Sequence, residues 1–127
     1  MKKPTDEWCA LAEKLFGVHH IEWERPERVA SEMQALLNAT PVQLSRNRAV
    51  IEMRLQGMTL QAIGDQWGIS RERVRQIETR WLRWARNPKN RSLYPNSCEQ
   101  VVRYATKLKQ ELTAAVNIST LRRAAPD

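Results

Sequence analysis

The chain has 127 residues, 42% of them hydrophobic, and this length supports one modest hydrophobic core or two very small ones. Its 21 basic and 14 acidic side chains give a net charge of +7, which favours a polyanionic partner, nucleic acid first, over a neutral ligand. No apolar run is long enough to span a bilayer or to form a signal-peptide core, so we expect a cytoplasmic protein without membrane association.

The apolar residues follow helical spacing from end to end, with almost no alternating β-type pattern, so the sequence predicts an all-α fold. A first helix is expected over residues 5–16, where a single apolar face stops at Gly17. The connector VHHIEWERP follows. A second amphipathic helix comes after it and is expected to end before Thr40 and Pro41.

A third helix is expected to begin after Ser45, which is a good N-cap residue, and to run through Leu55. Leu44 before the cap and Ala49 within the helix have the spacing of a hydrophobic staple. Gly57 would close this helix as the residue after its C-cap.

The stretch LQAIGDQWGISRERVRQI, residues 60–77, has the apolar spacing of a helix-turn-helix. Gly64 would let the two backbones approach each other, and Gly68 can adopt the left-handed conformation of the turn. The side chains that must meet across the turn are Ile63, Trp67, Val74 and Ile77.

The second helix of this unit is expected to begin at Ser70 as N-cap, with Glu72 near the positive end of the helix dipole. At 100° per residue it has a packing face and an opposite polar face. The packing face consists of Val74, Ile77, Trp81, Trp84 and Ala85. The polar face consists of Glu72, Arg75, Gln76, Thr79, Arg83 and Arg86.

Positive charge gathers on this same helix, because residues 71–91 contain eight basic and two acidic side chains. An ordinary amphipathic helix with a solvated charged face is the alternative interpretation. The turn glycine, the apolar spacing across the turn and the concentrated charge are separate requirements of a DNA-binding helix. All three are met here, which favours double-stranded DNA as the partner.

The stretch GMTLQAIGDQWGISRERVRQIETRWLRWARNP, with LSRNRAVIEMRL before it, resembles region 4 of bacterial primary-type sigma factors over about residues 44–88. The resemblance implies that the second helix enters the major groove of a promoter −35 element beside the RNA polymerase flap. It implies that Arg71, Glu72 and Gln76 read bases. Residues near the DNA backbone would be Ser70, Arg73, Arg75, Thr79, Arg80, Arg83 and Arg86.

The chemistry of the three reading positions agrees with this implication. Arginine can donate two hydrogen bonds to guanine, glutamate can accept a hydrogen bond from the N4 amino group of cytosine, and glutamine can pair with adenine. A carboxylate such as Glu72 in a phosphate-lined groove lowers affinity unless it makes a specific contact, so its presence argues for sequence-specific binding.

In the resemblance, the helix of residues 45–55 and the turn after it face RNA polymerase or its sigma factor. Val50, Met53 and Arg54 are the candidate contacts, since apolar groups lie on more than one side of this helix. The alternative is that the first two helices cover these apolar groups inside the protein.

Residues 1–43 are too short to melt and hold a −10 element, so we expect a stand-alone −35-reading module used as a transcription regulator. Small phage and mobile-element regulators use such modules. A late-gene antiterminator acting on paused polymerase and a phage DNA-packaging recognition subunit, similar to a small terminase, remain alternatives. In each case we expect a location in the bacterial cytoplasm, on the nucleoid when DNA is bound.

Three segments are predicted: an N-terminal helical segment (1–43), the helix-turn-helix domain (44–88), and a connector with a C-terminal helix (89–127). Ser97 and Gln100 have capping-box spacing at the start of that helix. Its apolar positions have coiled-coil spacing, which leaves open a homodimer seam or packing against Trp81 and Trp84. They are Val101, Ala105, Leu108, Leu112 and Ala115.

No catalytic residue, metal site or cofactor is predicted, and we expect a protein that is not an enzyme. His19 and His20 do not combine with Cys9 or Cys98 at the spacing of a common zinc site. The two cysteines stand far apart, so reduced thiols are expected.

Overall fold

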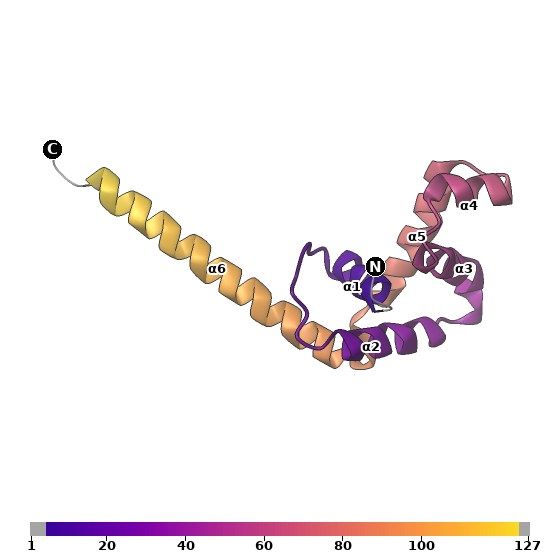
Figure 1. The fold of residues 1–127 in the computed structure, drawn as a ribbon, viewed down its shortest axis with the longest axis horizontal. Helices are drawn as coiled ribbons and strands as arrows, with labels where there is room; N and C mark the ends of the chain where they lie inside the picture. Colours follow the sequence, from indigo (N-terminus) through magenta and orange to yellow (C-terminus); the bar gives the residue numbers. More distant parts are fainter. Residues whose placement is uncertain (1–4, 125–127) are drawn as a thin grey trace.

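The computed structural model describes the backbone of residues 5–124 and the side chains of residues 5–115. These residues form helices and connecting segments without a β-strand, which confirms the predicted all-α fold. In chain order the elements are α1 (Asp6–Phe16), α2 (Pro26–Asn38), the 3₁₀ helix η1 (Val42–Leu44), α3 (Ser45–Leu55), α4 (Leu60–Trp67), α5 (Arg71–Ala85), the 3₁₀ helix η2 (Pro88–Leu93) and α6 (Pro95–Ala124). Figure 1 shows α1 to α5 gathered into one body from which α6 extends.

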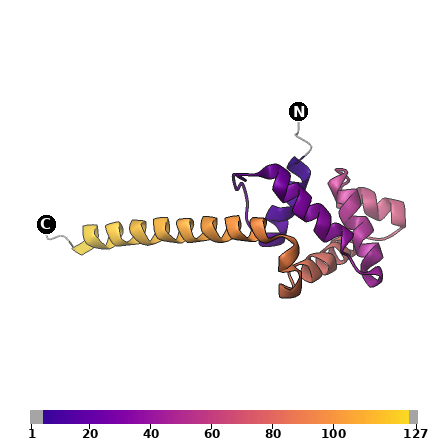
Figure 2. The ribbon, with the colours of Figure 1, turned by 90° about the horizontal axis from the view of Figure 1, so that it is seen from below.

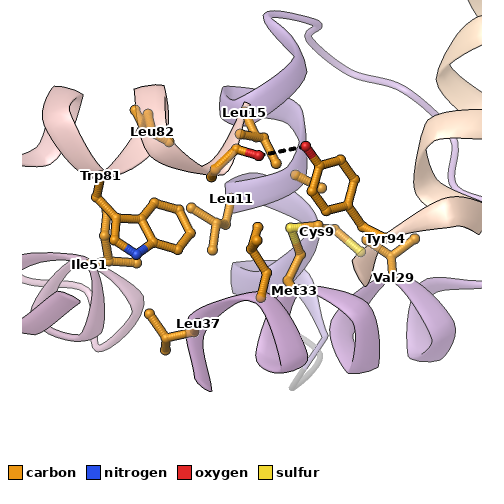
Figure 3. Close-up of a cluster of buried hydrophobic side chains, with 13 residues drawn as sticks. Cys9, Leu11, Leu15, Val29, Met33, Leu37, Ile51, Trp81, Leu82 and Tyr94 are labelled. Atoms are coloured by element: carbon orange, nitrogen blue, oxygen red, sulfur yellow. Dashed lines mark hydrogen bonds between the residues drawn. The ribbon is translucent and has the colours of Figure 1, made fainter. Parts of the chain in front are cut away.

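The larger of two hydrophobic clusters joins α1 and α2 to the second half of α5 and to η2. Trp81 lies in it with its indole N–H donated to Thr40 Oγ1 at 2.9 Å. The Tyr94 hydroxyl donates to the carbonyl oxygen of Ala85 at 2.6 Å, the hydrogen bond drawn dashed in Figure 3. The flanking segments therefore share one core with the end of α5, and the predicted divisions after residues 43 and 88 run through that core.

The smaller cluster is the core of the helix-turn-helix itself. Its buried members are Val50, Ile63, Val74 and Ile77. Helix α3 lies between the two clusters, because Val50 belongs to the smaller one and Ile51 to the larger. Asn47 ties α3 to α5 by donating its buried side-chain amide to the carbonyl oxygen of Ile77 at 2.7 Å. Apolar residues on both sides of α3 are thus used within the protein.

The start of α3 differs from the prediction, whereas its end agrees with it. Ser45 is not its N-cap, because the helix already begins at Ser45 as a continuation of η1, and no side chain caps it. At the other end Gly57 has φ +90°, as expected for the residue after the C-cap. The backbone N–H groups of Gly57 and Met58 donate to the carbonyls of Arg54 and Met53, which is a Schellman motif.

Helix α6 begins two residues earlier than the predicted capping box, at Pro95, so the expected Ser97–Gln100 box is wrong. Its N-terminus is instead capped by Glu32 of α2. One carboxylate oxygen accepts from the Ser97 N–H at 2.8 Å and from the Ser97 hydroxyl at 2.7 Å, and the other accepts from the Asn96 N–H at 3.0 Å. A distant carboxylate therefore satisfies backbone donors that a local side chain would otherwise satisfy.

Of the two alternatives left open for the C-terminal helix, packing back on Trp81 and Trp84 is not the arrangement found. Both views in Figures 1 and 2 show α6 leaving the body beside α2 and running outward. Trp81 is covered by the α1–α2 cluster instead, and every α6 side chain from Ala105 to Ala115 is exposed. Within residues 5–124 no helix is both long and apolar enough to cross a membrane.

Candidate nucleic-acid interface

The turn between α4 and α5 has the geometry that the sequence predicts. Gly68 has φ +68°, in the left-handed region, and the Ile69 N–H donates to the carbonyl of Gly64 at 2.9 Å. Ser70 caps α5, because its hydroxyl oxygen accepts the N–H of Arg73 at 3.1 Å. Thr59, which the sequence analysis did not single out, caps α4 in the same way through the N–H of Ala62.

Gly64 is required by the close approach of the turn to α4. A Cβ atom at this position would lie 2.6 Å from the carbonyl oxygen of Ile69, a distance that backbone atoms do not tolerate. The predicted role of this glycine is therefore confirmed. Together with the buried Ile63, Val74 and Ile77, it fixes the angle at which α4 presents α5.

Helix α5 has one buried face and one exposed face, as predicted, although the buried face is wider. Besides the predicted residues it includes Glu78 and Leu82, while Trp84 is half-buried. The residues predicted to read bases, Arg71, Glu72 and Gln76, are all exposed in its first two turns. Exposed arginines that flank or follow them are Arg73, Arg75, Arg80 and Arg83.

Glu72 and Arg75 form a two-pronged ion pair on this face. Arg75 Nε donates to one carboxylate oxygen at 3.0 Å and Nη2 to the other at 2.5 Å. The hydrogen bonds from Arg75, helped by its charge and that of Arg71, lower the pKa of the Glu72 carboxyl, and the same bonds raise the pKa of Arg75. Glu72 is therefore a charged acceptor whose oxygens are already engaged in the free protein.

A second contact engages another of the predicted reading residues. Arg73 Nη1 donates to the side-chain oxygen of Gln76 at 3.3 Å. Two neighbouring pairs, Glu72 with Arg75 and Gln76 with Arg73, thus order the exposed face before any ligand is bound. For Arg71 the described residues include no such partner, so its guanidinium is left for a ligand.

The remaining predicted backbone contacts do not all lie in one place. Thr79 donates its hydroxyl to the carbonyl of Arg75 at 2.8 Å, on the same exposed side of the helix. Arg86 lies beyond the last turn of α5, where its Nε donates to the carbonyl of Leu15 at 2.9 Å. Its guanidinium binds carbonyl groups at the C-terminus of α1, which argues against the predicted contact of Arg86 with DNA.

Two of the three predicted polymerase contacts also have roles inside the protein. Val50 is 0% exposed, so the prediction that it touches a partner is wrong. Arg54 donates its Nε to Glu78 at 3.0 Å and its Nη1 to the carbonyl of Met58 at 3.0 Å. Met53 remains half-buried against the smaller cluster. The burial of Val50 against α4 and α5 and the pairing of Arg54 with Glu78 could not be seen in the local sequence.

Glu78 links the helix-turn-helix to the N-terminal segment. Its side chain is 4% exposed and pairs with Lys14 of α1 as well as with Arg54 of α3. Three helices therefore meet at one carboxylate on the buried side of α5. The sequence pattern assigned Glu78 no role, because both of its cationic partners come from other helices.

Arg46 is a further cation near the reading helix that the sequence analysis missed. Its guanidinium lies over the ring of Trp67, 5.4 Å from the ring centroid. Trp67 ends α4 directly before the turn, so this contact holds an exposed arginine of α3 beside the start of α5.

Histidine and cysteine do not form a metal site in the part of the chain described here. Residues 5–115 contain no group of three or more metal-ligating side chains. Cys9 is buried, and this burial raises the pKa of its thiol to about 11, so the thiol is protonated at neutral pH. The pKa of Cys98 is raised by burial as well.

The tight left-handed turn, the close approach at Gly64 and the exposed basic face of α5 define a helix-turn-helix DNA-binding module. Residues 45–84 match the family model described as Sigma-70, region 4. The chain therefore carries a sigma-70 region 4-like DNA-binding domain, as the sequence predicted. Neither the curated proteins nor the solved structures gave a match to the chain.

Proposed function

We propose that this protein is a transcription regulator that reads a −35-like promoter site by placing the first turns of α5 in the major groove. The exposed trio of Arg71, Glu72 and Gln76 at the N-terminal end of α5 is the observation that carries the proposal. Its chemical diversity supports sequence-specific binding, and the fixed turn at Gly68 supports its presentation to DNA. The protein acts in the bacterial cytoplasm, on the nucleoid.

Binding requires the two ordered pairs on α5 to rearrange. Glu72 can accept a cytosine amino group while keeping one oxygen on Arg75, because a carboxylate has about four lone-pair sites. Gln76 pairs with adenine once Arg73 turns toward a phosphate, a strongly attractive acceptor for a guanidinium. Arg71 can reach guanine without breaking a contact.

Phosphate contacts come from the arginines around this trio. The proposed backbone set is Ser70, Arg73, Arg75, Thr79, Arg80 and Arg83, with Arg46 added beside the turn. These several cations predict that log K for duplex DNA falls with log salt concentration at a slope of magnitude roughly 3–6. A slope near zero would contradict DNA as the main ligand.

Selection of binding sites from random duplexes tests the reading roles. Glu72→Ala and Gln76→Ala should each relax one position of the selected motif and weaken the cognate site by about 1–3 kcal/mol. Arg80→Ala should weaken all sequences about equally, and Arg28→Ala, which alters an exposed arginine on α2, is the matched control. An unchanged motif for both α5 variants would refute base reading by this face.

The proposed polymerase contact is narrower than the sequence suggested. The surface available near the end of α3 consists of Gln56 and Gly57, which are exposed, and the half-buried Met53 and Met58. We expect weak binding to RNA polymerase or its sigma factor through this turn, strengthened when a selected DNA site is present. The exposed position of Gln56 lets a charge be introduced without disturbing either core.

A pull-down from bacterial extract, with and without the selected duplex, tests this contact. Gln56→Asp should lose polymerase and keep DNA, whereas Gln61→Asp on the exposed side of α4 should keep polymerase. Recovery of polymerase only from paused complexes would assign the protein to antiterminators. A large ring in solution that binds DNA without polymerase would assign it to DNA-packaging recognition subunits.

A further inference from the structure

Helix α6 exposes an apolar stripe over much of its length. The helix has 30 residues. Its first turns contact α2 and η2, and the rest of the helix continues outward (Figure 2). Leu108 is 44% exposed and Leu112 is 60% exposed, on the same side of the helix as Ala105 and Ala115. An unsupported helix is marginally stable in water, and an exposed apolar stripe adds to the need for a partner.

The connector between α1 and α2 forms one wall of a groove beside this stripe. Gln100 of α6 donates to the carbonyl of Glu22 at 2.8 Å and accepts from the N–H of Glu24 at 3.2 Å, which holds the connector against the helix. The groove has a volume of about 500 Å³ and is lined by Ile21 and Glu22 on one side and by Tyr104 and Leu108 on the other. It runs from the connector directly onto the apolar stripe.

The order of residues along the stripe is symmetric about Gln110. Equal steps in the two directions reach Leu108 and Leu112, then Ala105 and Ala115, then Val101 and Ser119. Gln110 lies within one residue of the middle of α6, which spans Pro95–Ala124. A second α6 running in the opposite direction would thus overlap the whole helix, with leucine facing leucine and alanine facing alanine at the four central positions.

We propose that α6 pairs with α6 of a second copy of this chain in an antiparallel two-fold interface. In this register Leu108 packs against the partner's Leu112 and Ala105 against the partner's Ala115, and the same contacts recur on the other side of the dyad. Each groove receives the distal half of the opposite helix. The interface is therefore self-complementary, as a two-fold contact must be.

The charge pattern agrees with the antiparallel direction. The last turn of α6 carries Arg122 and Arg123 in the sequence, and the antiparallel register brings it to the end where the partner's connector lies. That connector carries Glu22 and Glu24, both exposed, and Glu24 already pairs with Arg103 of its own α6 at 3.4 Å. A parallel pair would instead place the two basic ends next to each other, where they repel.

This pairing separates the two DNA-binding modules. A helix of 30 residues is about 45 Å long, and antiparallel packing puts one helix-turn-helix near each end of the pair. The dimer would present its two reading helices to separate sites or separate duplexes, not to adjacent half-sites. The interface itself does not depend on the proposed reading of a −35-like site.

Sedimentation equilibrium of the full chain in the absence of DNA tests the pairing. The wild type should be dimeric at roughly 100 µM, and combining Leu108→Asp with Leu112→Asp should weaken the dimer at least about 100-fold, because paired carboxylates would be buried. Gln110→Asp, on the opposite side of the helix, is the control and should remain dimeric. Unchanged circular dichroism would show that these exposed substitutions leave the body folded.

A charge-swapped variant tests the direction of the helices. When Leu108→Asp is combined with Leu112→Lys in one chain, an antiparallel pair brings each aspartate against a lysine, so the dimer should be recovered relative to the double aspartate variant. In a parallel pair each aspartate would face an aspartate and each lysine a lysine, so the variant would remain monomeric. The proposal would be overturned if the wild type were monomeric or if the double aspartate variant stayed dimeric. It would also be overturned if Gln110→Asp weakened the dimer as much as the double aspartate change, or if the charge swap did not restore the dimer.

Discussion

Helices α5 and α6 are both long, yet their positions are determined in different ways. Helix α5 is capped by Ser70, its own neighbour in sequence, and is buried along one face from Val74 to Ala85. Helix α6 is capped by Glu32 of α2 and leaves the body after its first turns. Local sequence therefore determines where α5 begins, whereas the start of α6 depends on a contact between distant segments.

The largest effect on the α5 side is expected from Gly64→Ala. The added Cβ would clash with the Ile69 carbonyl oxygen at 2.6 Å, and because that atom belongs to the backbone of the turn, α4 and α5 must separate. We expect a loss of about 3 kcal/mol in the free energy of unfolding, together with weaker DNA binding. Urea denaturation monitored by tryptophan fluorescence measures the first quantity.

Gly68→Ala is the matched comparison in the same turn. A Cβ there meets nothing within 4 Å, so its cost comes only from φ +68°, about 1 kcal/mol. If Gly64→Ala destabilised the protein no more than Gly68→Ala, the close approach of the turn to α4 would not be a determinant of the fold.

On the α6 side the largest effect is expected from Glu32→Ala. The substitution removes the acceptor of the Asn96 and Ser97 N–H groups and leaves the fully buried Ser97 hydroxyl without its partner. We expect a loss of about 1–3 kcal/mol and faster hydrogen exchange in the first turn of α6. Hydrogen exchange followed by mass spectrometry measures the local part of this effect.

Gln34→Ala, an exposed change on the same helix, serves as the control and should leave both quantities unchanged. If the hydrogen-exchange protection of the α6 amides were the same in Glu32→Ala as in the wild type, α6 would not need the carboxylate of α2 in order to begin at Pro95.

These contrasts explain which parts of the molecule the sequence could predict. The turn at Gly68, the cap at Ser70 and the two faces of α5 depend on residues within one or two helical turns, and all were predicted correctly. The cap of α6 joins residues 65 positions apart, and Lys14 and Glu78 are 64 positions apart. Pairs so far apart in sequence leave no periodic pattern from which they could be predicted.

The same reasoning applies to the candidate site. The composition of the exposed face of α5 follows from helical periodicity, and the structure confirms that Arg71, Glu72 and Gln76 are exposed there. Arg86 and Arg54 belong to the same basic pattern but are used in the contact with α1 and in the pair with Glu78. Only tertiary contacts, with α1 for Arg86 and with α5 for Arg54, distinguish an arginine that stabilises the fold from one left for a ligand.

The smallest expected effect concerns the exposed pair on α5, where no burial amplifies the interaction. The hydrogen bonds from Arg75 hold the pKa of the Glu72 carboxyl below its usual value, so the pair contributes stability at neutral pH and loses it as the pH falls through that lowered pKa. Because both side chains are in solvent, the global unfolding curve should hardly respond.

A carboxyl-detected NMR titration should show the Glu72 midpoint below the ordinary glutamate range and, in Arg75→Gln, a rise toward it. Arg80→Gln, which alters an exposed arginine on another side of the same helix, should leave the midpoint where it is. A midpoint that did not move in Arg75→Gln would mean that the pair does not persist in solution, and Glu72 would then meet DNA without having to share its oxygens.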